Sequence, residues 1–254
     1  VAALDGDRRE ARIFLAAPLS RAGIEEDFAD QIVEQESVAW NARLEQVEAK
    51  RERRLWSLVL EERPLAAPSQ EAVVAAMLDG IRQMGLAALP WSQAASSLRA
   101  RVAFLRRVEG EAWPDLGDDA LSASLEDWLG PHLDGVTRRA HLDRLDMHEA
   151  LAARLDWKQR QALDTLAPTH LTVPSGSRVP VDYDAPVPVL AVRLQEMFGA
   201  AETPKLAGGK AAVLLHLLSP ARRPVQVTQD LKSFWVNGYA AVRADLRGQY
   251  PKHS

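Results

Sequence analysis

The stretch Ser175-Gly176-Ser177-Arg178 places a glycine between two hydroxyl residues and follows them with an arginine. Such a segment could cradle a phosphate, because free backbone N–H groups and a guanidinium group both bind oxyanions. It could equally be the turn of a β-hairpin, since short apolar stretches at 170–173 and 179–181 flank it. In a hairpin, Arg178 would lie at an exposed tip.

Further basic and aromatic residues follow in the last third of the chain. Arg222 and Arg223 lie in a second predicted turn, SPARRP, at 219–224. A planar guanidinium suits phosphate contact, and an aromatic ring can stack on a base. The candidate nucleic-acid-binding residues are therefore Arg178, Arg222, Arg223, Arg243, Arg247, Lys252, Trp235 and Tyr239, with Tyr250 nearby. The alternative is that the turn arginines are merely solvated, and that Trp235 and Tyr239 belong to a core.

His141 and His148 are seven residues apart and would share one helix face, with Asp143 and Glu149 near them. Metal sites use such spacings, but no third fixed ligand is evident. The alternative is a polar surface helix. We predict no metal site.

Catalytic motifs are equally weak. Ser175 or Ser177 could pair with His170 or His216, but a triad is defined by geometry rather than by residue types. The sequence contains no GxxxxGK[ST], GxGxxG or GxSxG motif. Its nearest string, AGGK at 207–210, is predicted to be the turn into the following strand. We therefore predict neither a catalytic residue nor a bound cofactor in this chain.

The elements that must position these residues fall into three predicted regions. Residues 1–65 are predicted to be β-rich, with a strand at 11–19 and alternating apolar positions from Val38 to Leu60, although the run of Arg and Glu in this stretch also suits a helix. Residues 66–168 read as helices at about 66–84, 98–108, 118–129, 142–151 and 158–166. Residues 169–254 are predicted to form a compact α+β domain with two hairpins. In it we expect helices at 189–198 and from 231 on, and strands at 210–218 and 225–231.

The composition limits the classes of protein to which this chain can belong. The 254 residues are 47% apolar, and only 6% are aromatic, which favours helices over an all-β fold. The formal net charge is −4, yet residues 169–254 carry ten Lys and Arg against six Asp and Glu, a net of +4. The remainder has 21 against 29, a net of −8. The last third is thus the basic part, although its charge is modest for a nucleic-acid-binding domain.

Cysteine is missing from the sequence, which excludes disulfides, thiolate metal sites and cysteine nucleophiles. No apolar run approaches the roughly 20 residues that cross a bilayer, and no signal peptide is visible. We expect a cytoplasmic protein that does not contact membranes. Because the chain starts without a methionine, we also expect a piece of a longer protein.

Several long strings resemble the C-terminal region of the bacterial HrpB proteins, which are ATP-dependent helicases of the DEAH/RHA type usually described as RNA helicases. They include VPSGSRVPVDYD (173–184), PVLAVRLQEMFG (188–199), the stretch 203–235, and RADLRGQYPKH (243–253). LPW (89–91), WPDL (113–116) and REARIFLAAPL (9–19) are similar too, so the resemblance covers essentially the whole chain.

The resemblance implies a place in a larger machine. Relatives begin with two RecA-like motor domains that bind ATP and magnesium, followed by a winged helix, a helical bundle, an oligonucleotide-binding (OB) type β unit and a C-terminal domain. This chain matches only the last parts and lacks every motor motif. Relatives also continue beyond PKH with a tryptophan-proline-acidic segment. The resemblance implies an OB-like first unit and an accessory region.

We therefore predict that the chain binds or guides single-stranded RNA, or DNA, and docks on its own motor domains. The first alternative is a protein-interaction or bracing module that does not contact nucleic acid. The second is an independent hydrolase, which requires a cleft holding a base and a nucleophile in contact.

Overall fold

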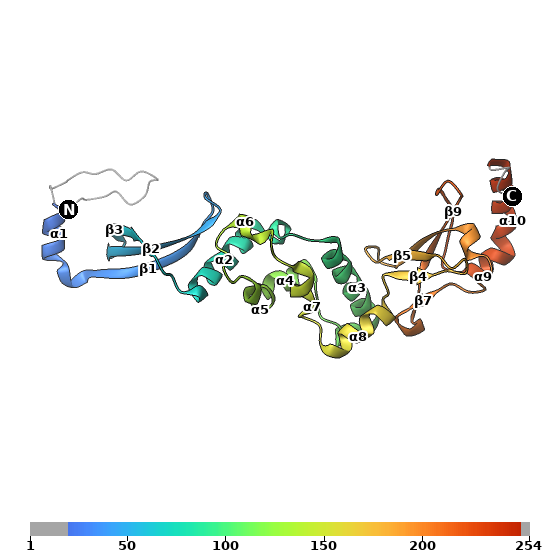
Figure 1. Cartoon of the computed structure of the whole chain (residues 1–254), viewed down its shortest axis with the longest axis horizontal. Helices are drawn as coiled ribbons and strands as arrows, with labels where there is room; N and C mark the ends of the chain where they lie inside the picture. The colour runs from blue at the N-terminus through green and yellow to red at the C-terminus, as the bar shows by residue number, and fades with distance from the viewer. Residues whose placement is uncertain (1–19, 250–254) are drawn as a thin grey trace, which may run out of the picture. The chain divides into compact units, whose positions relative to one another are not determined.

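The computed structural model describes residues 20–249 of the chain. The chain folds as two compact units, residues 1–80 and 81–254, each of which is drawn in Figure 1. The strand predicted at 11–19 lies outside the described residues, as do Tyr250 and Lys252. None of the described helices is long and apolar enough to cross a membrane.

A three-stranded antiparallel sheet forms most of the first unit, in the order β1-β2-β3. The sheet follows the short helix α1, and the long helix α2 begins in the same unit and continues beyond it. The elements are α1 Arg21–Asp27, β1 Ile32–Asn41, β2 Gln46–Leu55, β3 Leu58–Pro64 and α2 Gln70–Met84. The β-rich interpretation of this part is confirmed for these strands.

Local signals explain these boundaries. Ser20 caps α1, and the Asn41 side chain accepts N–H groups in the turn between β1 and β2. The Ser69 hydroxyl accepts the Ala72 N–H at 3.2 Å, so the predicted cap of α2 is confirmed. Gly80 lies against the Trp40 ring, and a Cβ there would approach the ring to 2.4 Å, so only glycine fits at this position.

The second unit begins with a helical layer. Its helices are α3 Gln93–Glu109, α4 Asp118–Ala123, α5 Leu125–Leu129, α6 Arg139–Leu142, α7 Met147–Ala152 and α8 Trp157–Leu166, and a 3₁₀ turn, Leu86–Ala88, precedes them. Leu98, Val102 and Leu105 of α3 are buried in this layer, as the apolar periodicity predicts. The single helix predicted at 118–129 is wrong. The chain breaks at Ser124, whose hydroxyl bonds back to the Ala120 carbonyl at 2.8 Å.

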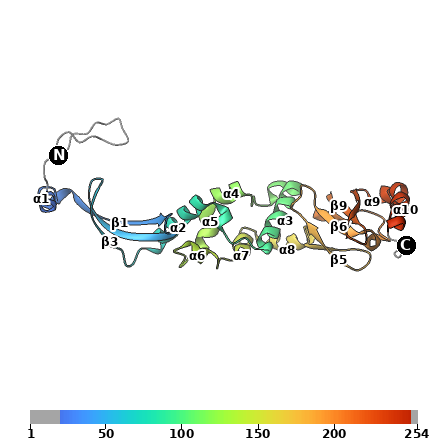
Figure 2. The same ribbon diagram turned by 90° about the horizontal axis from the view of Figure 1, so that it is seen from above.

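The helices lead into a five-stranded sheet of order β10-β9-β6-β5-β4. Its strands are β4 His170–Thr172, β5 Arg178–Asp182, β6 Val189–Arg193, β9 Leu214–Leu218 and β10 Pro224–Thr228. All neighbours are antiparallel except β6 and β9, which are parallel. The hairpins β4–β5 and β9–β10 confirm the two predicted hairpins and form the two edges of the sheet. Figure 2 shows β5, β6 and β9 of this sheet. The chain is thus a mixed α+β protein.

Two short strands and a C-terminal helical segment complete the described part of this unit. The strands β7 Lys205–Leu206 and β8 Ala211–Ala212 pair across a 3₁₀ turn, Ala207–Gly209, as predicted for AGGK. After β10 the chain ends in α9 Leu231–Ser233, a π-helical turn, Phe234–Gly238, and α10 Tyr239–Gln249.

Two predictions for this sheet are wrong. Residues 189–193 form the central strand β6 instead of a helix, and a 3₁₀ turn, Leu194–Met197, follows it. Because β6 lies between two strands and most of it is buried, its sequence lacks the alternation that marks an edge strand. The single strand predicted at 210–218 is split at Val213 into β8 and β9, which belong to different sheets.

Side chains from both layers fasten the sheet to the helices. Arg101 of α3 is 7% exposed, donates to the Ala167 carbonyl at 2.5 Å and pairs with Asp164. The Tyr183 hydroxyl donates to the Pro168 carbonyl at 2.7 Å, and its ring contacts Phe104. Burial raises the pKa of Tyr183. The predicted boundary near residue 168 therefore lies inside one packed unit, and the three-region division stays a prediction.

Glu109 at the end of α3 makes a further link. It accepts the Lys210 ammonium at 2.6 Å and the Trp113 indole N–H at 2.8 Å. These two hydrogen bonds, that from Lys210 first, lower the pKa of Glu109. The lysine of the AGGK string, which lies in the turn between β7 and β8, thus anchors the two-stranded sheet to α3.

Candidate functional site

The register of the five-stranded sheet brings both hairpin tips to one end. Strands β4, β6 and β9 run toward this end, whereas β5 and β10 start from it. Arg178 begins β5, and Arg222 and Arg223 lie in the turn that precedes β10. The structure therefore brings these three candidate residues to the same end of the sheet, which we call the basic end.

A fourth arginine belongs to the basic end. Arg193 is the last residue of β6 and pairs with Leu218, the last residue of β9. Its side chain lies on the exposed side of the sheet, as does that of Arg178. Sequence reasoning missed Arg193 because it assigned 189–198 to a helix. The short apolar run Val189-Leu190-Ala191-Val192 after Pro188, which begins and ends with a β-branched valine, was the signal for a strand.

The guanidinium groups of the basic end have no ion-pair partner among the described residues. Arg178, Arg193, Arg222 and Arg223 are exposed, and within residues 20–249 no carboxylate forms an ion pair with any of the four. Such forks can contact phosphate oxygens without first breaking a protein contact.

The turn that carries Arg222 is held rigidly. Ser219 is 1% exposed; its N–H donates to the Arg223 carbonyl at 2.8 Å, and its hydroxyl accepts the Arg223 N–H. Arg222 has a φ of 60°, a left-handed conformation that costs a non-glycine residue about 1 kcal/mol. Strain of this kind at an exposed arginine is a pointer to function.

The tip of the first hairpin is an ordinary turn. The Gly176 N–H donates to the Val173 carbonyl at 2.8 Å, and Gly176 has a φ of 87°. The Ser175 and Ser177 hydroxyls lie 3.1 Å apart and bond to each other. The hairpin interpretation of Ser-Gly-Ser-Arg is therefore confirmed.

Aromatic residues gather next to this end. The 3₁₀ turn Leu194–Met197 leads from Arg193 to Phe198, and its Glu196 carbonyl accepts the Ser175 N–H at 3.2 Å. Phe198 lies with its ring centroid 5.9 Å from that of Trp235 and 6.0 Å from that of Tyr239. With Phe234 these rings form the aromatic cluster, beside a hollow of about 400 Å³.

The structure does not place every candidate residue at the basic end. Trp235 and Tyr239 are half-buried in the aromatic cluster, and the Trp235 indole donates to the Ala200 carbonyl at 2.8 Å. Arg243 is exposed on α10, and Arg247 lies further along the same helix.

The weaker catalytic and metal candidates remain apart. His141 and His148 do not share a helix, because the segment 143–146 separates α6 from α7. Within the described part of the chain, no group of three or more metal-ligating residues occurs. His170 bonds only to the neighbouring Thr169 hydroxyl, at 3.2 Å, and neither serine hydroxyl of the hairpin tip bonds to a histidine in residues 20–249.

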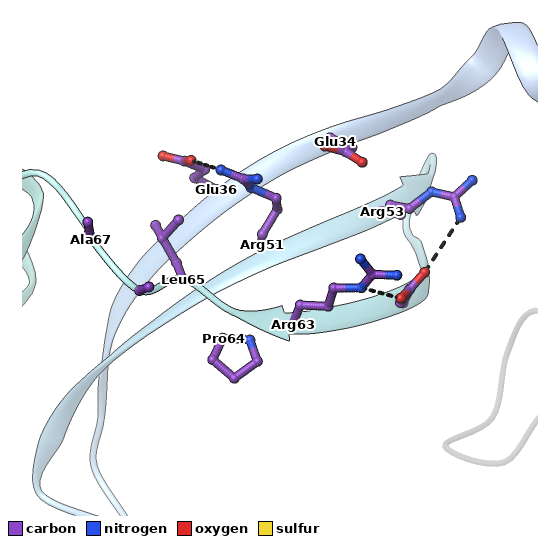
Figure 3. Close-up of a pocket in the computed structure, with 10 residues that line it drawn as sticks. Glu34, Glu36, Arg51, Arg53, Arg63, Pro64, Leu65 and Ala67 are labelled. Carbon is purple, nitrogen blue, oxygen red and sulfur yellow. Dashed lines mark hydrogen bonds and ion pairs between the residues drawn. The ribbon is translucent and has the colours of Figure 1, made fainter.

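The first unit holds a second charged surface, which Figure 3 shows. A hollow of about 700 Å³ opens on one face of its sheet between three glutamates and three arginines, namely Glu34, Glu36, Glu61, Arg51, Arg53 and Arg63. Arg51 pairs with Glu36 at 3.0 Å across β1 and β2.

Glu61 is the centre of this network. It accepts Arg63 at 2.5 Å, Arg21 at 3.1 Å and Arg53 at 3.5 Å. These contacts, the hydrogen bond from Arg63 first, lower the pKa of Glu61. The arginines of this surface, which we call the paired surface, are thus largely neutralised by their own sheet.

Comparison with known proteins decides the family. The family model described as "ATP-dependent helicase C-terminal", of the HrpB proteins, matches residues 128–254. The chain belongs to this family. The HrpB relative from Escherichia coli K12, named "ATP-dependent RNA helicase HrpB", is 40% identical over 247 residues, which are 96% of this chain and 30% of that protein.

Two crystal structures of HrpB proteins have the same fold. The E. coli DExH-box NTPase HrpB matches 99% of this chain and 32% of its own, with a TM-score of 0.72 and 38% identity. The E. coli DEAH/RHA helicase HrpB matches 88% of this chain and 28% of its own, with a TM-score of 0.66 and 40% identity. The HrpB-family chain described here thus spans about a third of the length of these relatives.

Proposed function

We propose that this chain is the accessory C-terminal part of an ATP-dependent RNA helicase, and that its basic end holds the backbone of single-stranded RNA. ATP and its magnesium ion would be bound by motor domains of the parent protein. The chain itself would supply a surface that retains the strand between motor steps. Family membership supports the place in the helicase, since the E. coli relative is named as an ATP-dependent RNA helicase.

The observation that carries the proposal is the convergence of four unpaired arginines at one end of a sheet. They come from three separate points in the sequence, at residues 178, 193 and 222–223. A translocating helicase must hold many sequences, so contacts to phosphates suit it better than contacts to base edges. Unpaired guanidinium groups provide such contacts, and the binding they produce weakens with salt.

The other parts of the chain take supporting roles in this proposal. The four-residue turn Leu194–Met197 connects the basic end to Phe198 of the aromatic cluster. Trp235 and Tyr239 of this cluster would stack on bases. The three antiparallel strands of the first unit are compatible with part of an OB-like barrel, which we retain as a proposal. The remaining surfaces would dock on the motor domains.

A fluorescence anisotropy titration tests this function. A single-stranded 12-nucleotide RNA is titrated with the 254-residue chain at low salt. Replacing Arg178, Arg222 and Arg223 by alanine together is expected to weaken binding at least about tenfold, because three charge-assisted contacts are lost. A DNA strand of the same sequence measures any preference for the 2′-hydroxyl.

A matched control separates local contacts from net charge. Arg138 and Arg144 are exposed arginines of the helical layer, and Arg138→Ala with Arg144→Ala removes two charges away from the sheet. This control should be compared with Arg222→Ala plus Arg223→Ala. Equal losses in the two double variants, or no binding by the unaltered chain, would contradict the proposal.

One observation favours the alternative of a protein-interaction module. Phe198 is 48% exposed and Val236 is 77% exposed, both in or beside the aromatic cluster. Exposed apolar side chains of this kind commonly mark protein contacts. If RNA does not bind, and Val236→Asp releases the chain from the separately purified motor part of the parent protein, the interaction module is the better description.

A further inference from the structure

Trp157 differs from the other tryptophans of the second unit in its exposure and in its hydrogen bonding. It is the first residue of α8 and is 61% exposed. The other four tryptophans of this unit donate their indole N–H to protein acceptors: Trp91 to Leu86, Trp113 to Glu109, Trp128 to Leu121 and Trp235 to Ala200. Within residues 20–249, the Trp157 indole has no hydrogen-bond partner and no ring contact. Its face and its N–H are both available to a ligand.

The backbone beneath Trp157 is rigid. Asp156 caps α8 by accepting the Gln159 N–H at 2.8 Å, and the Gln159 side chain accepts the Asp156 N–H at 2.8 Å. The Gln159 amide also donates to the Ala112 carbonyl at 2.6 Å, which ties this end of α8 to the end of α3. A ring presented from such a reciprocal cap loses little backbone freedom when it binds a partner.

One cation shares a hollow with the ring, and a second is next to it in the sequence. A hollow of about 530 Å³ is lined by Leu155, Trp157, Arg160 and Gln161. Arg160 donates its Nε to the Leu155 carbonyl at 3.0 Å, which fixes the guanidinium beside the ring and leaves its terminal amino groups free. Lys158 is exposed, and no carboxylate among the described residues pairs with Lys158 or Arg160.

We propose that Trp157 stacks on one unpaired base of a single strand, while Arg160 and Lys158 contact the adjoining phosphates. An exposed ring next to two free cations is the combination that single-stranded nucleic acid requires. A protein partner would need an apolar surround, whereas the only apolar neighbour in this hollow is the buried Leu155. This inference rests on the proposed function and adds a second contact point, on the helical layer.

The test compares a normal RNA with an abasic strand of the same length. The 254-residue chain and its variants are titrated by anisotropy against a 12-nucleotide oligo(U) and against a 12-nucleotide abasic phosphodiester. Trp157→Ala is expected to weaken binding to the RNA about 5- to 150-fold, the usual range for loss of one base–aromatic stack. Binding to the abasic strand should stay the same, because its phosphates still meet Arg160 and Lys158.

Two further variants define the chemistry. Trp157→Tyr should restore most of the affinity, because it keeps a π face, whereas Trp157→Leu should behave like the alanine variant. Trp56→Ala is the matched control: Trp56 is 68% exposed, but the neighbouring Arg53 and Arg54 are ion-paired with glutamates. Its removal should leave RNA affinity unchanged.

Each other outcome has a distinct meaning. RNA binding by the unaltered chain that Trp157→Ala does not change overturns this inference and leaves the basic end untouched. Full affinity in Trp157→Leu overturns the stacking contact in favour of an apolar one. Failure of the unaltered chain to bind any RNA at low salt overturns the proposed function, and this inference with it.

Discussion

In the three-stranded sheet of the first unit, Arg51 and Arg53 pair with glutamates on adjacent strands, and Arg63 pairs with Glu61 on its own strand. At the basic end of the five-stranded sheet, arginines stand at strand ends and turns, and the described structure gives them no carboxylate partner. Both sheets therefore carry exposed guanidinium groups, but in one they are already neutralised. The number of arginines is therefore a poor guide to a phosphate site. What decides whether an arginine can bind phosphate is whether the fold places a carboxylate next to it.

The two sheets also differ in what stabilises them. Leu215 in β9 is fully buried, whereas Leu58 at the start of β3 is 52% exposed. Leu215→Ala should cost about 2–5 kcal/mol of unfolding free energy, because a buried cavity is left. Leu58→Ala should cost less than about 1 kcal/mol. Amide hydrogen exchange measures the protection of the two sheets separately. Equal losses of protection in β9 of the Leu215 variant and in β3 of the Leu58 variant would contradict this difference in stabilisation.

Glu109 fastens the turn between β7 and β8 to the helical layer through Lys210, whereas the ion pairs of the paired surface lie within the first unit. Glu109→Gln should destabilise the second unit by about 1–2 kcal/mol at pH 7, because a charge-assisted contact with Lys210 is lost. The folded pKa of Glu109 is lowered, so this contribution is complete above the ordinary carboxyl pKa of 4.5 and disappears as the pH falls through the lowered value. Denaturant unfolding of both proteins between pH 7 and pH 3 measures it. A stability difference that persists at pH 3 would show that Glu109 acts by another route.

Replacing Arg222 should change the stability of the protein and its RNA affinity in opposite directions. Arg222→Gly should raise the unfolding free energy by about 0.5–1 kcal/mol, because glycine adopts a φ of 60° without strain. The same variant should bind RNA more weakly, since one phosphate contact is lost. Thermal unfolding and RNA titration of the same preparation test both halves. A variant that is neither more stable nor weaker in binding would mean that Arg222 is only a solvated turn residue.

The smallest expected effect probes the paired surface itself. Glu61→Gln removes the carboxylate that Arg21, Arg53 and Arg63 share. If pairing is what keeps this surface from binding RNA, the variant should bind RNA roughly two- to threefold more tightly at low salt, because cations are released. The control is Glu62→Gln on the same strand, whose carboxylate has Lys50 as its single ion-pair partner among residues 20–249. Equal RNA affinity of the unaltered chain, Glu61→Gln and Glu62→Gln would mean that ion pairing does not explain a difference in RNA binding between the two sheets.

Much of the fold could be predicted from sequence where the local signal was strong. Alternation marked the strands of the first unit, Ser69 and Gly85 marked the ends of α2, and Gly176 marked a hairpin turn. These features depend on residues close together in the chain. The places of Arg178, Arg222 and Arg223 at hairpin tips were also predicted, because turn residues between strands lie at exposed tips, whereas their meeting at one end of the sheet was left open.

The rest depends on contacts between distant residues. β6 was taken for a helix because its burial comes from β5 and β9, and this error concealed Arg193. The neutralisation of Arg53 depends on its register against Glu61, which no local pattern specifies. Trp157 gave no signal in the sequence, since only the structure shows that its indole is exposed and without a partner while the other tryptophans of its unit are bonded.

The most direct measurement is the salt dependence of RNA binding at the basic end. For a single strand, the slope of log K against log salt concentration changes by about 0.7 for each phosphate contact. The variant that replaces Arg178, Arg222 and Arg223 by alanine should therefore have a slope shallower by about 2 than that of the unaltered chain. The same replacement of Arg51, Arg53 and Arg63 should leave the slope unchanged. Equal slopes for the unaltered chain and the Arg178, Arg222 and Arg223 variant would contradict the account.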